Sequence, residues 1–401
     1  MVQQDAQKTN TVGYPGLNKC MDAKQKFDLF QNRKHFCAAP WNLLYVWVDG
    51  KVSSCTKGNP LGNLTTHGIK EIVHNKGFTK LREDIYADKI TENCRNCLAS
   101  ENTTSAGKFK GLRNHYNKLG VNSSVDYSNP KKFKLSALDL HWSSTCDLKC
   151  VTCWAEQSSS IAREQGMPVK HTPTKIAEGI IEYATANQSE LKEIYLSGGE
   201  PTLIKYNLKL LKQIEKRPDL QIRVNSNMQW KQDNSIIKEI LKFPNVLFTC
   251  SIDGIGEKFN YIRRGANWEK TINNIKFLQA QPNVDLRANT VFFVLTAQEI
   301  PDIVDYFMEE IGSIDHTINQ IAMGHPYLRC RNLPTSIKEN VRNKLTDTFE
   351  KYKSNLNIAG NIRRCLIELD NKGNSREYKN YFDRIDSLQG TNWRELYPEL
   401  T

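Results

Sequence analysis

The chain has 401 residues, of which 39% are hydrophobic and 25% are charged, so it can build a large domain with a smaller one beside it. The net charge of +11 favours acidic partners, but the 55 lysines and arginines are spread along the chain. Because the chain lacks an arginine-rich stripe interleaved with aromatic residues, we do not expect nucleic acid as a partner.

The amino terminus, MVQQDAQKTN, is polar, and no apolar run reaches membrane-spanning length. These features predict a cytoplasmic protein that does not contact a membrane. In that reducing compartment, clustered cysteines indicate metal ligands or catalytic groups rather than disulfides. Seven of the 11 cysteines form two compact sets, and we expect the other four to be buried thiols: Cys20, Cys250, Cys330 and Cys365.

Patterning of apolar residues, turns and cysteines divides the chain into stretches of different character. We expect a small cysteine-rich α+β region, then an α/β core, and finally helices packed on the outside of that core. The predicted stretches are a polar lead over 1–30, the cysteine-rich region over 31–110, a linker over 111–134, the core over 135–332 and a helical extension over 333–401.

The cysteine-rich region begins with CAAPWNLLYVWVDGKVSSC, which predicts two short strands joined by a turn at Asp49 and Gly50, with Trp41 and Trp47 packed inside the region. Helical spacing in the following residues predicts one or two short helices that return a CxxC pair towards this hairpin. Four thiolates can bind zinc or an iron–sulfur cluster, and spacing alone favours zinc. The four candidate ligands are Cys37, Cys55, Cys94 and Cys97.

From residue 136 onward the chain alternates apolar strands with amphipathic helices, a pattern typical of parallel βα units. Six units predict an open, partial (β/α)6 barrel rather than the closed barrel of eight. The expected strands cover 137–142, 192–197, 220–226, 245–253, 284–293 and 316–322.

Three cysteines follow the first of these strands in the sequence CDLKCVTC: Cys146, Cys150 and Cys153. A four-iron cluster normally takes four thiolates, so a loop that supplies three leaves one iron open for a substrate or cofactor. By itself the spacing also fits zinc binding or burial.

Polar and glycine-rich motifs follow the next three strands, where ligands bind in folds of this class. They are SGGEP at 197–201, NSN at 225–227, and SIDG at 251–254 followed by YIRRG. Glycines let a ligand approach the backbone, and an arginine can bind a carboxylate with two hydrogen bonds. Each motif alone also fits a turn, a strand end or an exposed arginine.

In this order along the chain, the cysteine triad and the three motifs resemble the radical S-adenosylmethionine (radical SAM) superfamily. The resemblance implies a [4Fe-4S] cluster on the triad, which acts in the reductive cleavage of SAM to a 5'-deoxyadenosyl radical. It also implies SAM contacts from Gly198, Gly199 and Glu200 to the amino group, from Asn225 or Asn227 to the ribose, and from Ser251 and Arg263 to the carboxylate.

The earlier cysteine set, with Gly50 between its first two members, resembles the SPASM or shorter twitch extension of radical SAM enzymes. The resemblance implies that these four cysteines hold an auxiliary [4Fe-4S] cluster. The further cysteines of a full SPASM module are absent, which favours a twitch-like region with one cluster. The order is unusual, because such extensions generally follow the barrel.

These resemblances imply an oxidoreductase-type radical SAM enzyme that abstracts hydrogen from a peptide or protein. The alternatives are a sugar-alcohol dehydrogenase of the twitch type, acting on a small molecule, and a non-catalytic metal- or cluster-bearing protein that binds nucleic acid. A one-electron donor such as flavodoxin or ferredoxin is the expected partner. Candidates near strand ends with weaker support are Asp253, Asn289, His316 and His325.

Overall fold

The structure is a computed structural model. The described residues are 21–95, 97–98, 111–121, 123–312, 314–320, 325–373 and 375–401. The expected polar lead falls outside them as far as residue 20, and so does Cys20; helix α1 begins at Ala23. Within these ranges no helix is both long and apolar enough to cross a membrane.

A nine-stranded sheet, in the order β3-β2-β1-β4-β5-β6-β7-β8-β9, organises the described residues. Strands β4 to β9 are parallel neighbours in chain order, which confirms the α/β fold with six consecutive parallel units. The strands are β1 Leu43–Val46, β2 Lys51–Ser53, β3 Gly62–Asn63, β4 Ala137–Leu140, β5 Glu193–Leu196, β6 Gln221–Ser226, β7 Val246–Ser251, β8 Val284–Phe292 and β9 Asp315–Gln320.

Strand β1 joins the cysteine-rich region to this sheet. It pairs antiparallel with β2 in the expected hairpin, and it also pairs in parallel with β4, with Leu43 opposite Ala137. All four residues of β1 are buried, as is typical of a strand covered on both faces. The cysteine-rich region therefore extends the barrel sheet instead of forming a sheet of its own.

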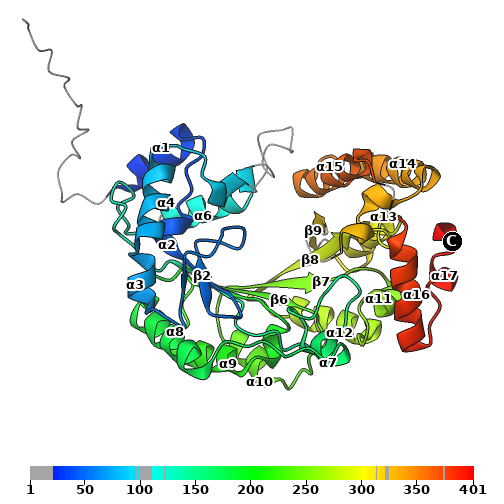
Figure 1. Ribbon diagram of the computed structural model, residues 1–401, viewed down its shortest axis with the longest axis horizontal. Coiled ribbons are helices and arrows are strands. Elements are labelled where there is room, and N and C mark those ends of the chain that lie inside the picture. Colours follow the sequence, from blue (N-terminus) through cyan, green and yellow to red (C-terminus); the bar gives the residue numbers. More distant parts are fainter. Residues whose placement is uncertain are drawn as a thin grey trace, which may run out of the picture.

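Helices cover the outer side of the curved sheet, and further helices stand at its two ends (Figure 1). Helices α8, α9, α10 and α12 follow the outer side, α1 to α4 and α6 lie at one end, and α13 to α16 lie at the other. The helices that precede the barrel are α1 Ala23–Asn32, α2 Ala39–Asn42, α3 Ile69–Val73, α4 Lys76–Tyr86 and α6 Leu112–Val121. The barrel helices are α7 Ser159–Glu164, α8 Thr174–Ala186, α9 Lys205–Gln213, α10 Ser235–Ile240, α11 Gly256–Ile262, α12 Trp268–Gln279 and α13 Ile300–Asp305. The last helices are α14 Thr335–Lys351, α15 Leu356–Asp370, α16 Glu377–Gln389 and α17 Trp393–Leu396.

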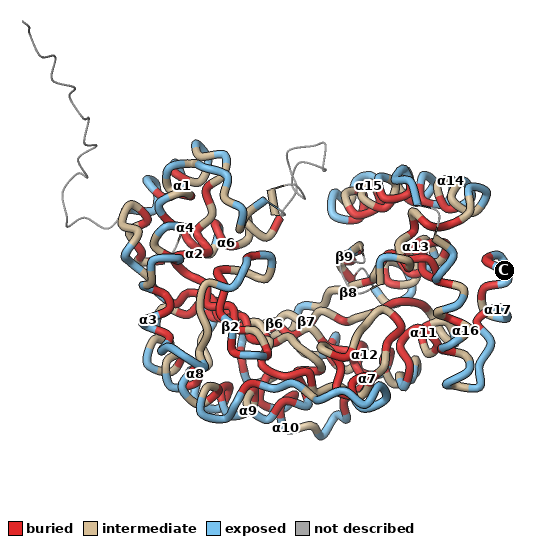
Figure 2. The backbone as a smooth tube through the Cα atoms, in the orientation of Figure 1, coloured by how far each residue is buried: buried red, intermediate tan, exposed pale blue. Residues whose placement is uncertain are grey.

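The two faces of the sheet differ in polarity because side chains alternate along each strand. On β6, Ile222 and Val224 are buried in the core against the outer helices, while Arg223 and Asn225 are half-buried on the inner face. Figure 2 shows burial concentrated in the strands and the inward sides of the helices. The same alternation places Ser251, the last residue of β7, on the inner face.

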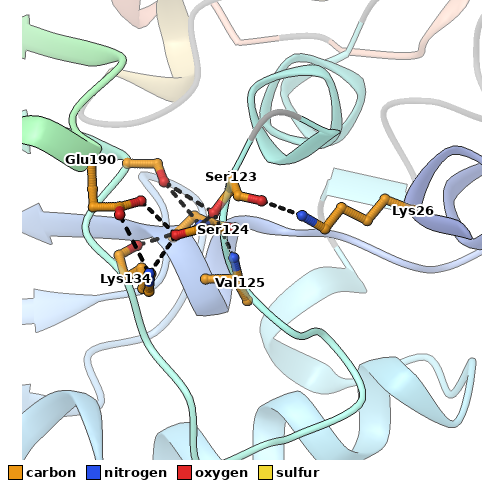
Figure 3. A network of polar contacts seen from close by, with 8 residues as sticks. Lys26, Ser123, Ser124, Val125, Lys134 and Glu190 are labelled. Atoms are coloured by element: carbon orange, nitrogen blue, oxygen red, sulfur yellow. Dashed lines mark hydrogen bonds and ion pairs between the residues drawn. The ribbon is translucent and has the colours of Figure 1, made fainter. Parts of the chain in front are cut away.

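A polar network fastens the segment after α6 to the barrel (Figure 3). The hydroxyl of Ser124 donates to Glu190 at 2.7 Å, and Lys134 forms an ion pair with the same carboxylate at 3.3 Å. On the other side, the buried ammonium of Lys26 in α1 donates to the carbonyl of Ser123. These contacts hold the amino-terminal helices against the start of the barrel.

Candidate active site

The loop that carries Cys146, Cys150 and Cys153 follows β4 and has little regular structure, so groups elsewhere must satisfy its backbone. Serine hydroxyls at the start of α7 form hydrogen bonds with the backbone of the first part of this loop. The hydroxyl of Ser159 accepts from the Cys146 amide and donates to the Cys146 carbonyl, both at 3.0 Å. The hydroxyl of Ser158 donates to the carbonyl of Leu148 at 2.6 Å.

The end of α11 holds the middle of the loop. The amides of Lys149 and Val151 donate to the carbonyls of Arg264 and Ile262, each at 2.9 Å. Arg264 in turn makes a two-pronged ion pair with Glu164 of α7, at 3.0 and 2.8 Å. The loop is therefore held between α7 and α11, and the cysteine side chains are left to face the inner side.

The SGGEP motif packs directly on the residues before the first cysteine. The amide of Gly199 donates to the carbonyl of Ser143 at 3.0 Å, and the amide of Glu200 donates to that of Thr145 at 2.7 Å. A Cβ atom on Gly199 would overlap the Thr145 carbonyl oxygen, and Gly198 has a φ of +111°. Only glycine fits this approach, which is the physical reason for the glycine pair.

Glu200 is 1% exposed, and its carboxylate binds groups of the chain itself. It accepts hydrogen bonds from the amide and hydroxyl of Thr202 at 3.1 and 2.7 Å, from the Ser226 hydroxyl at 3.1 Å, and from the Asn227 amide at 2.7 Å. Burial raises the pKa of Glu200, and these hydrogen bonds oppose the rise. Glu200 therefore ties the SGGEP turn to the end of β6.

A cavity of about 380 Å³ lies where these segments meet. It brings together the three cysteines of the core loop and all of the expected cofactor contacts except Glu200. The wall includes Cys146, Cys150, Cys153, Gly198, Gly199, Asn225, Asn227, Ser251 and Arg263.

Arg263 is oriented within this wall by Asp253, whose carboxylate accepts from the guanidinium at 2.6 Å and from the Val291 amide at 2.8 Å. Asp253 does not cap the following helix, because Ile255 is the residue that precedes α11. Nε of Arg263 is buried and finds no hydrogen-bond partner among the described residues. A buried donor of this kind is suited to a ligand carboxylate.

Cys150 is buried, and Cys146 and Cys153 are half-buried. Desolvation of the thiols is the main reason that the pKa of each is raised, to about 12 for Cys153. Arg263 lowers the pKa of Cys150 and Cys153, and backbone amides of Leu148 and Trp154 donate to Cys146 and Cys153. These groups stabilise thiolates, the form that binds iron. The donor set therefore fits a cluster that takes three thiolates.

The four cysteines of the second set come from separate segments of the cysteine-rich region. Cys37 precedes α2, Cys55 follows β2, and Cys94 and Cys97 lie after α4. Burial raises the pKa of Cys37, and the thiols of Cys94, Cys55 and Cys97 raise it further. Backbone amides donate to Cys37 and Cys55, as expected for thiolate ligands. Across the described ranges, no three His, Cys, Asp or Glu side chains converge as the ligands of one metal ion do.

The cysteine-rich region also supplies part of the cavity wall, through Tyr45, Trp47 and Thr56. The sequence predicts that Trp41 and Trp47 both pack inside the small region. Trp41 is fully buried there, whereas the Trp47 side chain reaches the cavity. Trp47 could be identified as a cavity residue from its position just after a strand that is parallel to the barrel strands. The parallel pairing of β1 is apparent only in the folded chain, however.

His141, which follows β4, is a further wall residue. Burial lowers its pKa to about 4, so the imidazole is neutral near pH 7. Nε2 is buried and lacks a hydrogen-bond partner within the part of the chain that the structure describes. His316, in contrast, is fully buried outside the cavity and bonds to the Thr290 hydroxyl at 2.8 Å.

Comparison with known families gives two matches. The sequence profile of the radical SAM superfamily matches residues 140–307, and that of the SPASM iron–sulfur cluster-binding domain matches residues 37–98. Two curated relatives are the GTP 3',8-cyclase of Marinobacter nauticus, 23% identical over 54% of this chain and 64% of the relative, and the probable GTP 3',8-cyclase of Methanocaldococcus jannaschii, 25% identical over 59% and 78%.

Solved structures with a similar arrangement include native anSMEcpe with bound AdoMet, with a TM-score of 0.41, 18% identity and coverage of 55% of this chain and 62% of that chain. Another is SuiB of Streptococcus suis bound to S-adenosylmethionine, with a TM-score of 0.39 and 18% identity. The match covers 55% of this chain and 46% of the SuiB chain. The match spans less than two thirds of the Marinobacter relative and of both solved chains.

Proposed function

Because the chain belongs to the radical SAM superfamily and carries a SPASM iron–sulfur domain ahead of its barrel, we propose that it is an oxidoreductase-type enzyme that modifies a peptide or protein. Its cofactors are SAM, a [4Fe-4S] cluster that binds SAM, and auxiliary iron–sulfur clusters in the SPASM domain. The observation that carries the proposal is the single cavity in which the cysteine triad meets Gly198, Gly199, Asn225 and Arg263.

When bound and reduced, the cluster on the triad supplies the electron that cleaves SAM and so starts hydrogen abstraction from the substrate. The chain's own residues hold SAM for this step. Arg263, fixed by Asp253, is placed to bind the methionine carboxylate together with Ser251. The backbone of Gly198 and Gly199 can approach the methionine amino group, and Glu200 acts as a positioning residue for that turn.

Of the two asparagines, we assign the ribose contact to Asn225. The side chain of Asn227 is already engaged, because its amide donates to Asp147 at 2.7 Å and its oxygen accepts from the Gln229 backbone at 2.9 Å. Asn225 lies on the inner face at the end of β6 and lines the cavity. A side chain in this position is free to turn towards a bound hydroxyl.

A peptide substrate is proposed because radical SAM enzymes with SPASM or twitch regions often modify peptides. The position of the SPASM region supports a direct role in the reaction. Thr56, next to the proposed ligand Cys55, lines the same cavity as the triad, and so does Trp47. These two residues support the proposal that the auxiliary cluster would bind substrate or accept an electron from the substrate radical, with flavodoxin or ferredoxin as the proposed external donor.

The proposed function predicts that anaerobically reconstituted protein, given dithionite and SAM, forms 5'-deoxyadenosine. The nucleoside is measured by liquid chromatography with mass spectrometry, and candidate peptides from reading frames beside the gene are scored by deuterium transfer into it. GTP is included because two relatives are named for its cyclisation. Deuterium transfer from GTP alone would replace the peptide assignment, and absence of 5'-deoxyadenosine together with tight nucleic-acid binding would remove the enzyme assignment.

Replacing Arg263 with lysine should weaken SAM binding by about tenfold, because hydrogen bonds to a charged group contribute about 1.5 to 3 kcal/mol and lysine cannot make the two-pronged contact. Calorimetric titration of SAM into the reconstituted variant measures the change. Arg331→Lys is the matched control, since Arg331 also pairs with a carboxylate, at 2.8 Å from Glu368, but outside the cavity wall. Equal SAM affinity in R263K and R331K would contradict the assignment.

A further inference from the structure

Two backbone carbonyls near the end of the cysteine-bearing loop, those of Val151 and Cys153, bond to side chains from the carboxyl-terminal part of the chain. The hydroxyl of Tyr381 in α16 donates to the Val151 carbonyl at 2.8 Å, and Nε2 of His325 lies 3.0 Å from the Cys153 carbonyl oxygen. Both residues lie beyond the segment that the radical SAM profile matches, which ends at residue 307. The superfamily core alone therefore leaves these two carbonyls to be met by another part of the chain.

The direction of these hydrogen bonds follows from the chemistry of their partners. A carbonyl oxygen can only accept, so Nε2 of His325 carries the hydrogen. Nδ1 of the same ring lies 2.7 Å from the Tyr327 hydroxyl, which can donate to it. Burial raises the pKa of Tyr381, so that its hydroxyl keeps its proton near neutral pH. Two donors are thus aimed at the backbone of the third cysteine's turn.

Packing makes this arrangement rigid. The rings of His325, Tyr327 and Tyr381 contact one another. The centroid of Tyr381 lies 5.1 Å from that of His325 and 5.4 Å from that of Tyr327, and the centroids of His325 and Tyr327 are 5.5 Å apart. The short helix that contains Tyr327, Pro326–Leu328, is anchored by the Asn332 amide, which donates to the carbonyls of Pro326 and Tyr327 at 3.1 Å each. The aromatic group therefore has little freedom to move away from the cluster loop.

We propose that His325 and Tyr381 are positioning residues that hold the turn from Val151 to Cys153 and raise the reduction potential of the cluster bound there. The proposal rests on the proposed function, because it requires a cluster on the triad. An N–H and an O–H directed at the ligand backbone place partial positive charge near the cluster and favour the added electron, and hydrogen bonds and solvent exposure are known to set such potentials. The carboxyl-terminal extension would thereby influence SAM cleavage without contacting SAM.

The test compares Tyr381→Phe, His325→Leu and His325→Gln in the full reconstituted chain. Midpoint potentials are measured by redox titration followed by electron paramagnetic resonance, and cluster retention is measured as the rate of iron loss to a chelator. Y381F and H325L should have more negative potentials and lose iron about fivefold faster, as expected for one lost hydrogen bond. H325Q keeps an N–H near the position of Nε2 and should restore the potential towards the wild-type value.

Tyr378→Phe is the matched control, because Tyr378 lies on the same helix, is fully buried, and has a hydroxyl with no hydrogen-bond partner in the described ranges. If the potentials of Y381F, H325L and H325Q all equal that of Y378F in protein that cleaves SAM, the positioning proposal is wrong and the proposed function stands. If the wild-type chain takes up no iron at the triad, both proposals fail. If H325L does not fold, the midpoint potentials of Y381F and H325Q are compared with that of Y378F to test the positioning proposal.

Discussion

Cys150→Ala is expected to reduce 5'-deoxyadenosine formation to the level of a protein-free control. Cys150 is 9% exposed and lies between the other two core cysteines on a loop whose backbone is held from α7 and α11. Its removal leaves two thiolates, too few to hold a cluster that already lacks a fourth protein ligand. Without the cluster the cavity has no source of the electron that SAM cleavage requires.

Iron analysis and nucleoside measurement on the same preparations separate this effect from misfolding. A variant with Cys146, Cys150 and Cys153 all replaced by alanine should keep about four iron atoms per chain, those of the auxiliary cluster. Cys250→Ala, which removes a buried thiol of β7 outside the cavity wall, should cleave SAM like the wild type. Zinc without iron in the triple variant would overturn the auxiliary-cluster assignment, and SAM cleavage by C150A would overturn the core assignment.

Gly199→Ala is expected to lower the free energy of unfolding by about 3 kcal/mol and to abolish measurable SAM binding. The new methyl group would overlap the carbonyl oxygen of Thr145, and backbone on both sides resists relaxation because the Glu200 amide donates to that same oxygen. Relief of the clash must push the SGGEP turn away from the residues that precede Cys146. The change therefore deforms the cavity wall as well as the fold.

Urea denaturation of the cluster-free protein measures the stability change, and calorimetry on reconstituted protein measures SAM binding. Gly179→Ala in α8 is the matched control, because a Cβ there would meet no atom within 4 Å. In a helix interior, this exchange should stabilise by up to about 1 kcal/mol. Wild-type stability in G199A would show that the turn can shift away from Thr145, contrary to the packing described above.

The unusual order of the two domains has a structural explanation in strand β1. An iron–sulfur region placed before the barrel can reach the cavity only if it packs beside the first barrel strand. Parallel pairing of Leu43–Val46 with Ala137–Leu140 achieves this, and it carries Tyr45 and Trp47 into the cavity wall. The sequence pattern indicates a region separate from the barrel. Parallel strands are joined by a long crossover, so the pairing of β1 with β4 leaves no local signature in the sequence.

Local patterns were sufficient for the six barrel strands and for the residues that follow them. Burial alternates every second residue along a strand, so strands such as Gln221–Ser226 can be recognised from the sequence. In a parallel sheet the residues that follow consecutive strands meet at one edge. The cysteine triad and Arg263 can therefore be assigned to one site from the order of the motifs alone, and the cavity does bring them together.

Contacts between residues far apart in the chain decided the rest. The sequence predicts a SAM contact for Glu200, and only the folded chain reveals that its carboxylate accepts hydrogen bonds from Thr202, Ser226 and Asn227. His325 meets Cys153 across 172 residues, and Tyr381 meets Val151 across 230. The sequence by itself determined the resemblance to the superfamily, the barrel strands and the candidate cysteine ligands, because periodicity and motif spacing are local. Only the tertiary structure decided which side chains orient those ligands and which region completes the cavity, because hydrogen bonding and burial depend on segments that the sequence does not place side by side.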